Sequence, residues 1–286
     1  MQFWIWIFSL YSVVYAVSKD QFCAHNYGGQ KEALDLIRVP SISSTKYPRI
    51  LCIVNTISTH HATHVQAIID TWGKQCDTLV FASNLTDTSL GTVAIDTPLH
   101  DHNHLWQKHK ATLKYIYAQY GNTFDWFYKS DDDAFVIVDN LKEYLRTPKY
   151  MTKMFSHPIT FGHRFQLPEA MLDYYIVDKE LRAEFKSKFK KWIFNSGGPG
   201  YAMNRMYLEK VLDSVHEHTC LSSRWSTMLP DDASISFCMA WNDAFPYDTR
   251  DLNRKERFHA DSPKGAYHSP IQPKDYWGTS HAYYNV

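Results

Sequence analysis

Three consecutive aspartates, Asp131, Asp132 and Asp133, interrupt the otherwise apolar stretch FDWFYKSDDDAFVIV at residues 124–138. Carboxylates buried without partners would cost too much free energy to serve as packing. On an extended backbone, Asp131 and Asp133 point to one side and Asp132 points to the other, so the first and third could share one cation. Carboxylate oxygens suit Mg²⁺, Mn²⁺ or Ca²⁺. An acidic surface turn and a helix cap remain the two alternative interpretations of the triplet.

The segments around the triplet alternate between strand-like and helix-like patterns. Apolar runs predict strands at residues 49–56, 77–84 and 126–128. Apolar positions at helical spacing predict helices at residues 64–72 and 105–121. A capping-box pattern from Asn140 to Glu143 predicts a further helix to about Arg146. This alternation predicts an α/β layered domain, in which ligands bind at the carboxyl ends of the strands, where the aspartates stand.

The composition limits the class of protein. The 286 residues carry 30 Lys and Arg against 30 Asp and Glu, a formal net charge of zero, so charge gives no support for binding nucleic acid. Hydrophobic residues make up 44% of the chain, which is enough for one sizeable core. The sequence shows no internal repeat and no low-complexity tract.

The N-terminal part of the chain indicates the secretory pathway. Residues 1–17 are apolar and uncharged, which predicts a signal anchor or a cleaved signal peptide, with a buried N-terminal strand or helix as the alternative. Residues 18–46 are polar and irregular, which predicts a stem, and residues 47–286 form the expected folded domain. Asn84 opens an N-glycosylation sequon that fits the same compartment.

The five cysteines are those of a protein from an oxidising compartment. Their spacing includes no close pair of the kind that binds zinc. We expect two disulfides, Cys220–Cys238 across a loop-like segment and Cys52–Cys76 between neighbouring strands, with Cys23 left over.

Seven segments occur in the order found in one known family. They are RILCIVNT, HVQAIIDTWGKQC, DWFYKSDDDAFVIVDNL, FGHRF, SGGPGYAM, PDDASISFCM and DTRDLNRKERFH. On these segments the chain resembles, from about residue 47 to residue 285, the core 1 β1,3-galactosyltransferase group (the T-synthases) of glycosyltransferase family 31, relatives of Fringe. The resemblance implies a GT-A fold with a Rossmann-like nucleotide-binding half joined to an acceptor half.

The same resemblance implies an activity and a location. The donor would be UDP-galactose, the cofactor Mn²⁺, and the acceptor GalNAc α-linked to Ser or Thr of a glycoprotein. The location would be the Golgi membrane with single-pass type II topology, and secretion after signal cleavage is the alternative. Relatives tend to be dimers, so a homodimer is a further expectation.

The resemblance also implies which residues contact the donor. Asp131 and Asp133 would hold the metal, with Asp133 as the direct ligand, and Asp131 or Asp132 would meet the ribose or a water. The first strand and helix would meet the uracil through Thr56, Asp70 and Trp72, although Trp72 fits a core position better. Backbone at Ser196, Gly197 and Gly198 would approach the donor sugar closely, because glycine has no Cβ. A tight turn without a ligand is the alternative for these last three residues.

The PDD segment would supply the general base of an inverting transfer. Asp232 is the first choice and Asp231 the second, because a carboxylate within hydrogen-bond reach is the usual base for a sugar hydroxyl. A pair of acids that cap a helix is the alternative, and it suits Asp231 in particular.

Two features depart from the family. Residues 166–194 form a longer link than in relatives and predict an inserted charged helix. The family's CCSD-like and FHYV-like segments, whose histidine is a metal ligand, find no match after DYWGTSHAYYNV. The remaining ligand position is therefore expected to be empty, filled by water, or filled by His268 or His281. A non-catalytic chaperone or partner of an active transferase, and a relative with another donor or acceptor, stay open as alternative functions.

Overall fold

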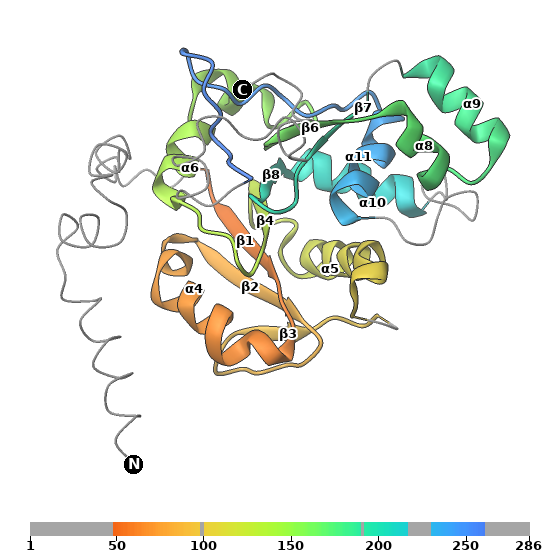
Figure 1. Ribbon diagram of the computed structural model, residues 1–286. Helices are drawn as coiled ribbons and strands as arrows, with labels where there is room; N and C mark the ends of the chain where they lie inside the picture. The colour runs from red at the N-terminus through yellow and green to blue at the C-terminus, as the bar shows by residue number, and fades with distance from the viewer. Residues whose placement is uncertain (1–47, 98–99, 190–191, 217–229, 261–286) are drawn as a thin grey trace, which may run out of the picture. The chain divides into compact units, whose positions relative to one another are not determined.

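A mixed α/β fold with one large sheet is seen in the computed structural model, which describes residues 48–97, 100–189, 192–216 and 230–260 (Figure 1). The large sheet has the strand order β3-β2-β1-β4-β8-β5. Its strands are β1 Ile50–Asn55, β2 Thr78–Ser83, β3 Thr92–Ala94, β4 Trp126–Asp131, β5 Thr160–Gly162 and β8 Tyr201–Asn204. Strands β1 to β4 are parallel to one another, whereas β8 runs antiparallel to β4 and to β5.

Helices cover both faces of this sheet, and α4 and α5 lie on opposite sides of it (Figure 1). The α-helices are α4 Gln66–Asp70, α5 Leu105–Tyr120, α6 Val138–Leu145, α7 Pro148–Lys153, α8 Glu169–Tyr175, α9 Lys179–Lys188, α10 Arg205–His216 and α11 Asp231–Ala240. Shorter helical turns are η1 Ser58–His60, η2 His61–Val65, η3 Trp72–Gln75 and η4 His102–His104. Helices α5, α10 and α11 pack on one face, and α4, α6 and α7 pack on the other.

Strand β1 shows why the sequence folds in this way. Leu51 and Ile53 point into the core beneath α5 and α10, whereas Cys52 and Val54 point into the core beneath α4 and α6, and all four are fully buried. A parallel strand buried on both faces needs a continuous apolar run, which is the pattern of RILCIVNT. The expected α/β layered domain is therefore confirmed.

A second, smaller layer stands beside the large sheet. Strands β6 Arg164–Leu167 and β7 Trp192–Asn195 pair antiparallel, and they share an aromatic core with α8, α9 and α11. The inserted segment thus contains two short helices, α8 and α9, where the sequence predicted one. Ile176 ends α8 in an extended conformation and Asp178 caps α9 by accepting from the Leu181 amide, so the chain turns between them.

Three further details differ from the sequence-based expectations. Strand β4 extends to Asp131, three residues beyond the predicted end, because Asp131 still pairs with Asn55 of β1. The helix predicted at 64–72 begins earlier, as a π-helical turn at His61, and breaks at Thr71. The expected capping box is wrong, because α6 already begins at Val138 and Asn140 lies inside it.

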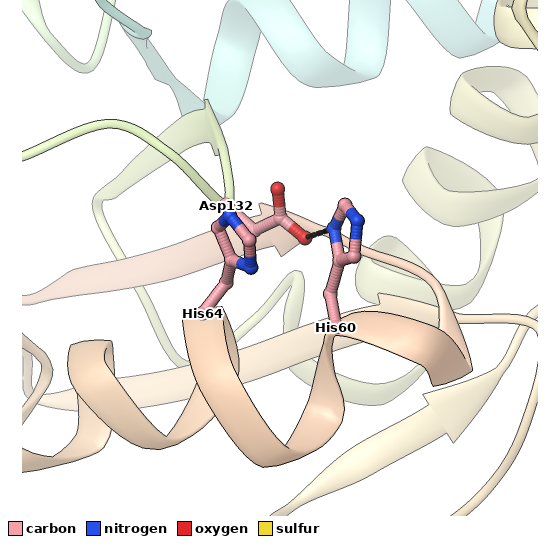
Figure 2. A group of neighbouring side chains, drawn as sticks. All are labelled: His60, His64 and Asp132. Atoms are coloured by element: carbon pink, nitrogen blue, oxygen red, sulfur yellow. Dashed lines mark hydrogen bonds and ion pairs between the residues drawn. The ribbon is translucent and has the colours of Figure 1, made fainter. Parts of the chain in front are cut away.

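The loop that follows β4 lies against the helical turns η1 and η2 (Figure 2). These turns follow β1, and the carboxyl ends of β1 and β4 are neighbours in the sheet. Segments that are far apart in the sequence are therefore brought together at the edge where the triplet stands.

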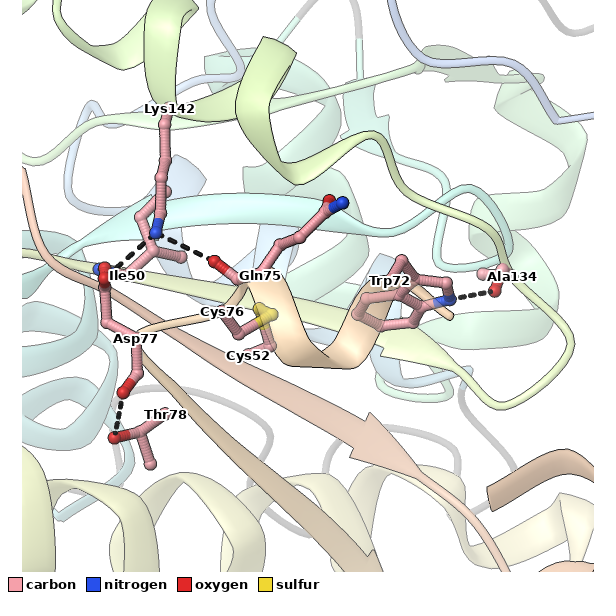
Figure 3. The surroundings of a disulfide bond; sticks show 9 residues. All are labelled: Ile50, Cys52, Trp72, Gln75, Cys76, Asp77, Thr78, Ala134 and Lys142. Carbon is pink, nitrogen blue, oxygen red and sulfur yellow. Dashed lines mark hydrogen bonds and ion pairs between the residues drawn. A yellow bond between two sulfur atoms is a disulfide. The ribbon is translucent and has the colours of Figure 1, made fainter. Parts of the chain in front are cut away.

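A disulfide joins Cys52 to Cys76, with their Cα atoms 6.0 Å apart, which confirms this predicted pair (Figure 3). It ties β1 to the end of η3, just before β2 begins. The same segment is held from the other side, because Lys142 of α6 donates to the Gln75 carbonyl and pairs with Asp77. The cross-link and these contacts fix the start of β2 against β1.

Several predicted features lie outside the described residues. They are the signal segment at residues 1–17, the stem at 18–46, Cys220 of the second expected disulfide, and the histidines His268 and His281. No helix in the described ranges is long and apolar enough to cross a membrane.

Removing the cross-link should destabilise the domain. We expect the double variant Cys52→Ala, Cys76→Ala to lose about 3 kcal/mol of unfolding free energy, because closing a loop of this length restricts the unfolded chain. Urea unfolding with and without a reductant measures this loss. The variant and the reduced wild type should both unfold at lower urea than the oxidised wild type, and equal midpoints would contradict a structural role for the bond.

Candidate active site

The three aspartates of the triplet point to different partners. Asp131 ends β4 and pairs with the Lys129 ammonium, its Oδ1 atom lying 2.9 Å from Nζ. Asp132 turns to the other side, where its Oδ2 atom accepts from the Thr56 hydroxyl at 2.6 Å and lies 2.8 Å from Nδ1 of His60. Asp133 is exposed. Asp131 and Asp132 therefore point to different sides, as the sequence predicted, although β4 ends at Asp131 and Asp132 lies in the turn that follows.

The potential metal ligands gather around Asp132. Among the described residues, His60, His64 and Asp132 offer ligand atoms that all lie within 4.8 Å of one another, and both histidines project toward the carboxylate (Figure 2). Two imidazoles and a carboxylate fit a divalent transition-metal ion. Neither Asp131 nor Asp133 belongs to this group, so their assignment as the metal pair stays a prediction.

Lys129 connects the triplet to the second acidic segment. Its side chain is 1% exposed, and Nζ lies 2.9 Å from Asp131 Oδ1 and 2.8 Å from Asp231 Oδ2. Burial alone would lower the pKa of Lys129, but the two carboxylates hold it well above its usual value. A charge this deeply buried is tolerated only when it is paired, so the ammonium fixes the end of β4 against the start of α11.

Asp231 is the buried partner at the first turn of α11. Burial would raise the pKa of Asp231, but the Lys129 ammonium holds it below its usual value. His109 of α5 lies behind it, and burial lowers the pKa of His109 to about 4, so the ring is neutral. Its Nε2 atom lies 2.8 Å from the Tyr201 hydroxyl. Asp231 is thus a fixed anion in the first turn of α11, where Pro230, and not Asp231, is the N-cap residue.

Asp232 has a different environment from its neighbour. Its Oδ2 atom accepts from the Gly197 amide at 2.9 Å and its Oδ1 atom accepts from the Ala233 amide at 2.7 Å. Burial and the adjacent Asp231 charge raise the pKa of Asp232 to about 7. A carboxylate with a pKa near neutrality can exchange a proton with a bound hydroxyl, which is the property that a general base needs.

The glycine segment lies directly beside Asp232. Ser196 is buried, and its amide donates to the His163 carbonyl. A Cβ added at Gly197 would stand 3.4 Å from Asp232 and from Lys129 Nζ, whereas one at Gly198 would meet only Ser196 Oγ at 4.0 Å. A side chain at Gly197 would therefore be in ordinary van der Waals contact with Asp232 and Lys129, and one at Gly198 would have more open space. Contact of these residues with a donor sugar stays a prediction.

The residues predicted to meet the nucleotide divide into two groups. Thr56 lies at the site, bound to Asp132, and its carbonyl accepts from Nζ of the buried Lys108 at 2.5 Å. Trp72 is a buried core residue, and its Nε1 atom donates to the Ala134 carbonyl, which holds the loop after the triplet (Figure 3). Asp70 is exposed and accepts from Gln66 on its own helix. The structure thus brings Thr56, but not Asp70, to the triplet.

One predicted surface residue and one buried arginine remain to be placed. Asn84 is exposed just after β2, where its Oδ1 atom accepts from the Ser58 amide, and its glycosylation stays a prediction. Arg164 of β6 pairs with Asp248 at 2.9 Å, so the DTRD segment is a salt-bridged turn.

Sequence reasoning missed four residues that the structure places at this site. They are Lys129, His60, His64 and Lys108. Three of them carried a signal. Lys129 interrupts an apolar strand two positions before Asp131, hence on the same side of it. His60 and His64 are four residues apart, a spacing that puts two side chains on one helix face. Lys108 carried none, because nothing in a helical pattern shows which lysine is buried.

Comparison with known proteins agrees with the fold. The family model described as Fringe-like matches residues 45–259. The chain is also 26% identical over 245 residues to glycoprotein-N-acetylgalactosamine 3-beta-galactosyltransferase 1 of Xenopus laevis, a match that covers 85% of the chain and 59% of that protein. The chain thus spans a little under three fifths of the relative's length. The mostly parallel sheet with its acidic edge is consistent with a GT-A-like fold, and the chain belongs to the Fringe-like family of glycosyltransferases.

Proposed function

We propose that the protein is an inverting galactosyltransferase that moves galactose from UDP-galactose to GalNAc α-linked to Ser or Thr, forming a β1,3 bond. Three findings support this proposal: the Fringe-like match, the name of the relative from Xenopus laevis, and the pair of acidic clusters at one sheet edge. The observation that carries it is Asp232, which has a pKa of about 7 and lies beside the glycine turn.

Each cluster would have one task in this reaction. Asp232 would accept the proton of the acceptor hydroxyl as its oxygen attacks the anomeric carbon of galactose. The bond from that carbon to the UDP oxygen would break on the opposite face, and the configuration would invert. A divalent cation, when bound, supplies charge neutralisation for the departing diphosphate. His60, His64 and Asp132 are the residues whose geometry would hold that cation, whereas the resemblance alone implies Asp131 and Asp133 as its ligands.

Lys129 and Asp231 would set up the base without taking part in proton transfer. The fixed negative charge of Asp231 contributes to the raised pKa of Asp232. The buried ammonium of Lys129 keeps Asp231 ionised, so the effect on Asp232 persists at neutral pH. The buried Lys108, which donates to the Thr56 carbonyl, also adds positive charge beside the triplet.

The cellular setting is part of the same proposal. A galactosyltransferase of glycoproteins needs access to acceptors in the secretory pathway, and the Cys52–Cys76 disulfide fits that oxidising compartment. We infer that residues 1–17 anchor the chain in the Golgi membrane or are cleaved before secretion, that residues 18–46 form the stem, and that the chain forms a homodimer.

A transfer assay tests this function. Wild-type protein with Mn²⁺, UDP-galactose and a GalNAc-bearing peptide should release UDP and form the disaccharide. Asp232→Asn should lower kcat by about 10² to 10⁴, the range for loss of a general base, and should leave UDP affinity nearly unchanged. Asp213→Asn, an exposed aspartate of α10, is the matched control and should keep full activity. Folded protein without turnover would favour a non-catalytic partner role, and faster turnover with another UDP-sugar would replace the donor.

The pH profile tests the assigned base separately. Because the proton must leave Asp232 before it can act, kcat/KM should rise with pH, with unit slope below about 7, and then level off. The stability should change in the opposite sense. The folded state holds this proton more tightly than the unfolded chain, so the Asp232 contribution to stability falls as the pH rises from about 4 to about 7. Asp232→Asn should lack that part of the slope in thermal unfolding, and an identical slope would count against the raised pKa.

A further inference from the structure

His60 and His64 form an unusual pair beside the triplet. They stand four residues apart across η1 and η2, and their rings stack with centroids 4.3 Å apart and planes at 25°. Asp132 approaches them from the loop after β4 (Figure 2). The group therefore joins two segments that are about seventy residues apart. The assignment of Asp131 and Asp133 as metal ligands gives this group no role.

We propose that His60, His64 and Asp132 bind one divalent transition-metal ion through two imidazole nitrogens and one carboxylate oxygen. The inference rests on the proposed function in one respect: the bound ion would be the ion that contacts the diphosphate of the donor. Metal binding itself needs no donor and can be measured alone.

The distances in the group are close to those of a coordination sphere. Two ligands about 2.1 Å from one metal stand roughly 3.0 to 3.4 Å apart at octahedral or tetrahedral angles. His60 Nδ1 and Asp132 Oδ2 are 2.8 Å apart, and all three ligand atoms fit within 4.8 Å. Small rotations of side chains that are partly exposed would bring these atoms to coordination distance, and the backbone need not move.

Neighbouring hydroxyls orient two of the three ligands. The Thr56 hydroxyl donates to Asp132 Oδ2, so the carboxylate is held in place before any ion binds. The Thr63 hydroxyl lies 3.0 Å from His64 Nδ1 and donates toward the His60 carbonyl at 3.4 Å. Its lone pairs can then accept the Nδ1 proton, which leaves Nε2 of His64 as the metal-binding nitrogen. Partners of this kind commonly orient metal-binding histidines.

The donor set determines which metals would bind. Mg²⁺ and Ca²⁺ prefer oxygen ligands alone, whereas imidazole favours first-row transition metals. For such a site, affinity should rise from Mn²⁺ to Co²⁺, and Mg²⁺ should bind weakest. Three protein ligands leave coordination positions open, and diphosphate oxygens could occupy these. The cysteine spacing that argues against a zinc site does not bear on a site of histidine and aspartate.

Calorimetry and spectroscopy of the full chain, stripped of metal and free of nucleotide, test the proposal. Titration with Co²⁺ should show one site and produce absorption in the visible range. Mn²⁺ should bind more weakly than Co²⁺. The electron spin echo spectrum of bound Mn²⁺ should show coupling to imidazole nitrogen. His64→Gln should weaken Co²⁺ binding by roughly tenfold or more. This variant should fold normally, because the contacts of the His64 ring with Thr63 and His60 lie within its own helical segment. His157→Gln is the matched control, because His157 is exposed and lies near the start of β5, at the other end of the sheet.

The possible results distinguish a failure of the proposed metal site from a failure of the proposed transferase activity. Absence of Co²⁺ binding by folded wild type, equal affinity in His64→Gln, or bound Mn²⁺ without nitrogen coupling would each overturn the site, even if transfer proceeds. Metal binding that depends on His60 and His64 in a protein that transfers no sugar would support the site and count against the proposed function alone.

Discussion

The buried ammonium of Lys129 is the interaction on which the rest of the site depends. It lies between Asp131 at the end of β4 and Asp231 at the start of α11, within 3 Å of both. Removing one partner of a buried ion pair leaves a charge that the protein interior cannot solvate. The ammonium therefore determines the positions of both acidic segments, and the two can have separate chemical tasks only because their separation is fixed.

Side chains at the end of β4 point to two opposite sides, and each side would have one of the two proposed chemical tasks. Lys129 and Asp131 point toward α11 and the glycine turn, where Asp232 has its raised pKa. Asp132 points the opposite way, toward Thr56 and the histidines of η1 and η2. One short strand thus separates the side of the proposed base from the side of the proposed cation ligands. The Cys52–Cys76 disulfide and the hydrogen bond from Trp72 to Ala134 hold the surrounding segments against that strand.

Much of this arrangement could be predicted from the sequence, and the exceptions have physical reasons. Continuous apolar runs identified β1 and β2, because strands buried on both faces require them. The break of the first helix at Thr71 was not predictable, because it follows from the docking of Trp72 into the core beneath α6. The roles of Asp131 and Asp132 also depend on residues distant in the sequence. Asp231 shares the Lys129 ammonium with Asp131, and the His60 ring contacts Asp132. Spacing along the chain can show that carboxylates are close together, but not which cation each one faces.

A double-mutant cycle on Lys129 and Asp231 tests the central claim most directly. The free energy of unfolding would be measured for the wild type, Lys129→Met, Asp231→Asn and the double variant. Each single change should cost about 3 to 5 kcal/mol. Lys129→Met leaves Asp231 buried without its cation, and Asp231→Asn leaves the buried ammonium with only the partly exposed Asp131 as its partner. The double change should cost clearly less than the sum of the two. Additive costs would show that the two groups do not interact, and the account of a site organised around one buried ammonium would then be wrong.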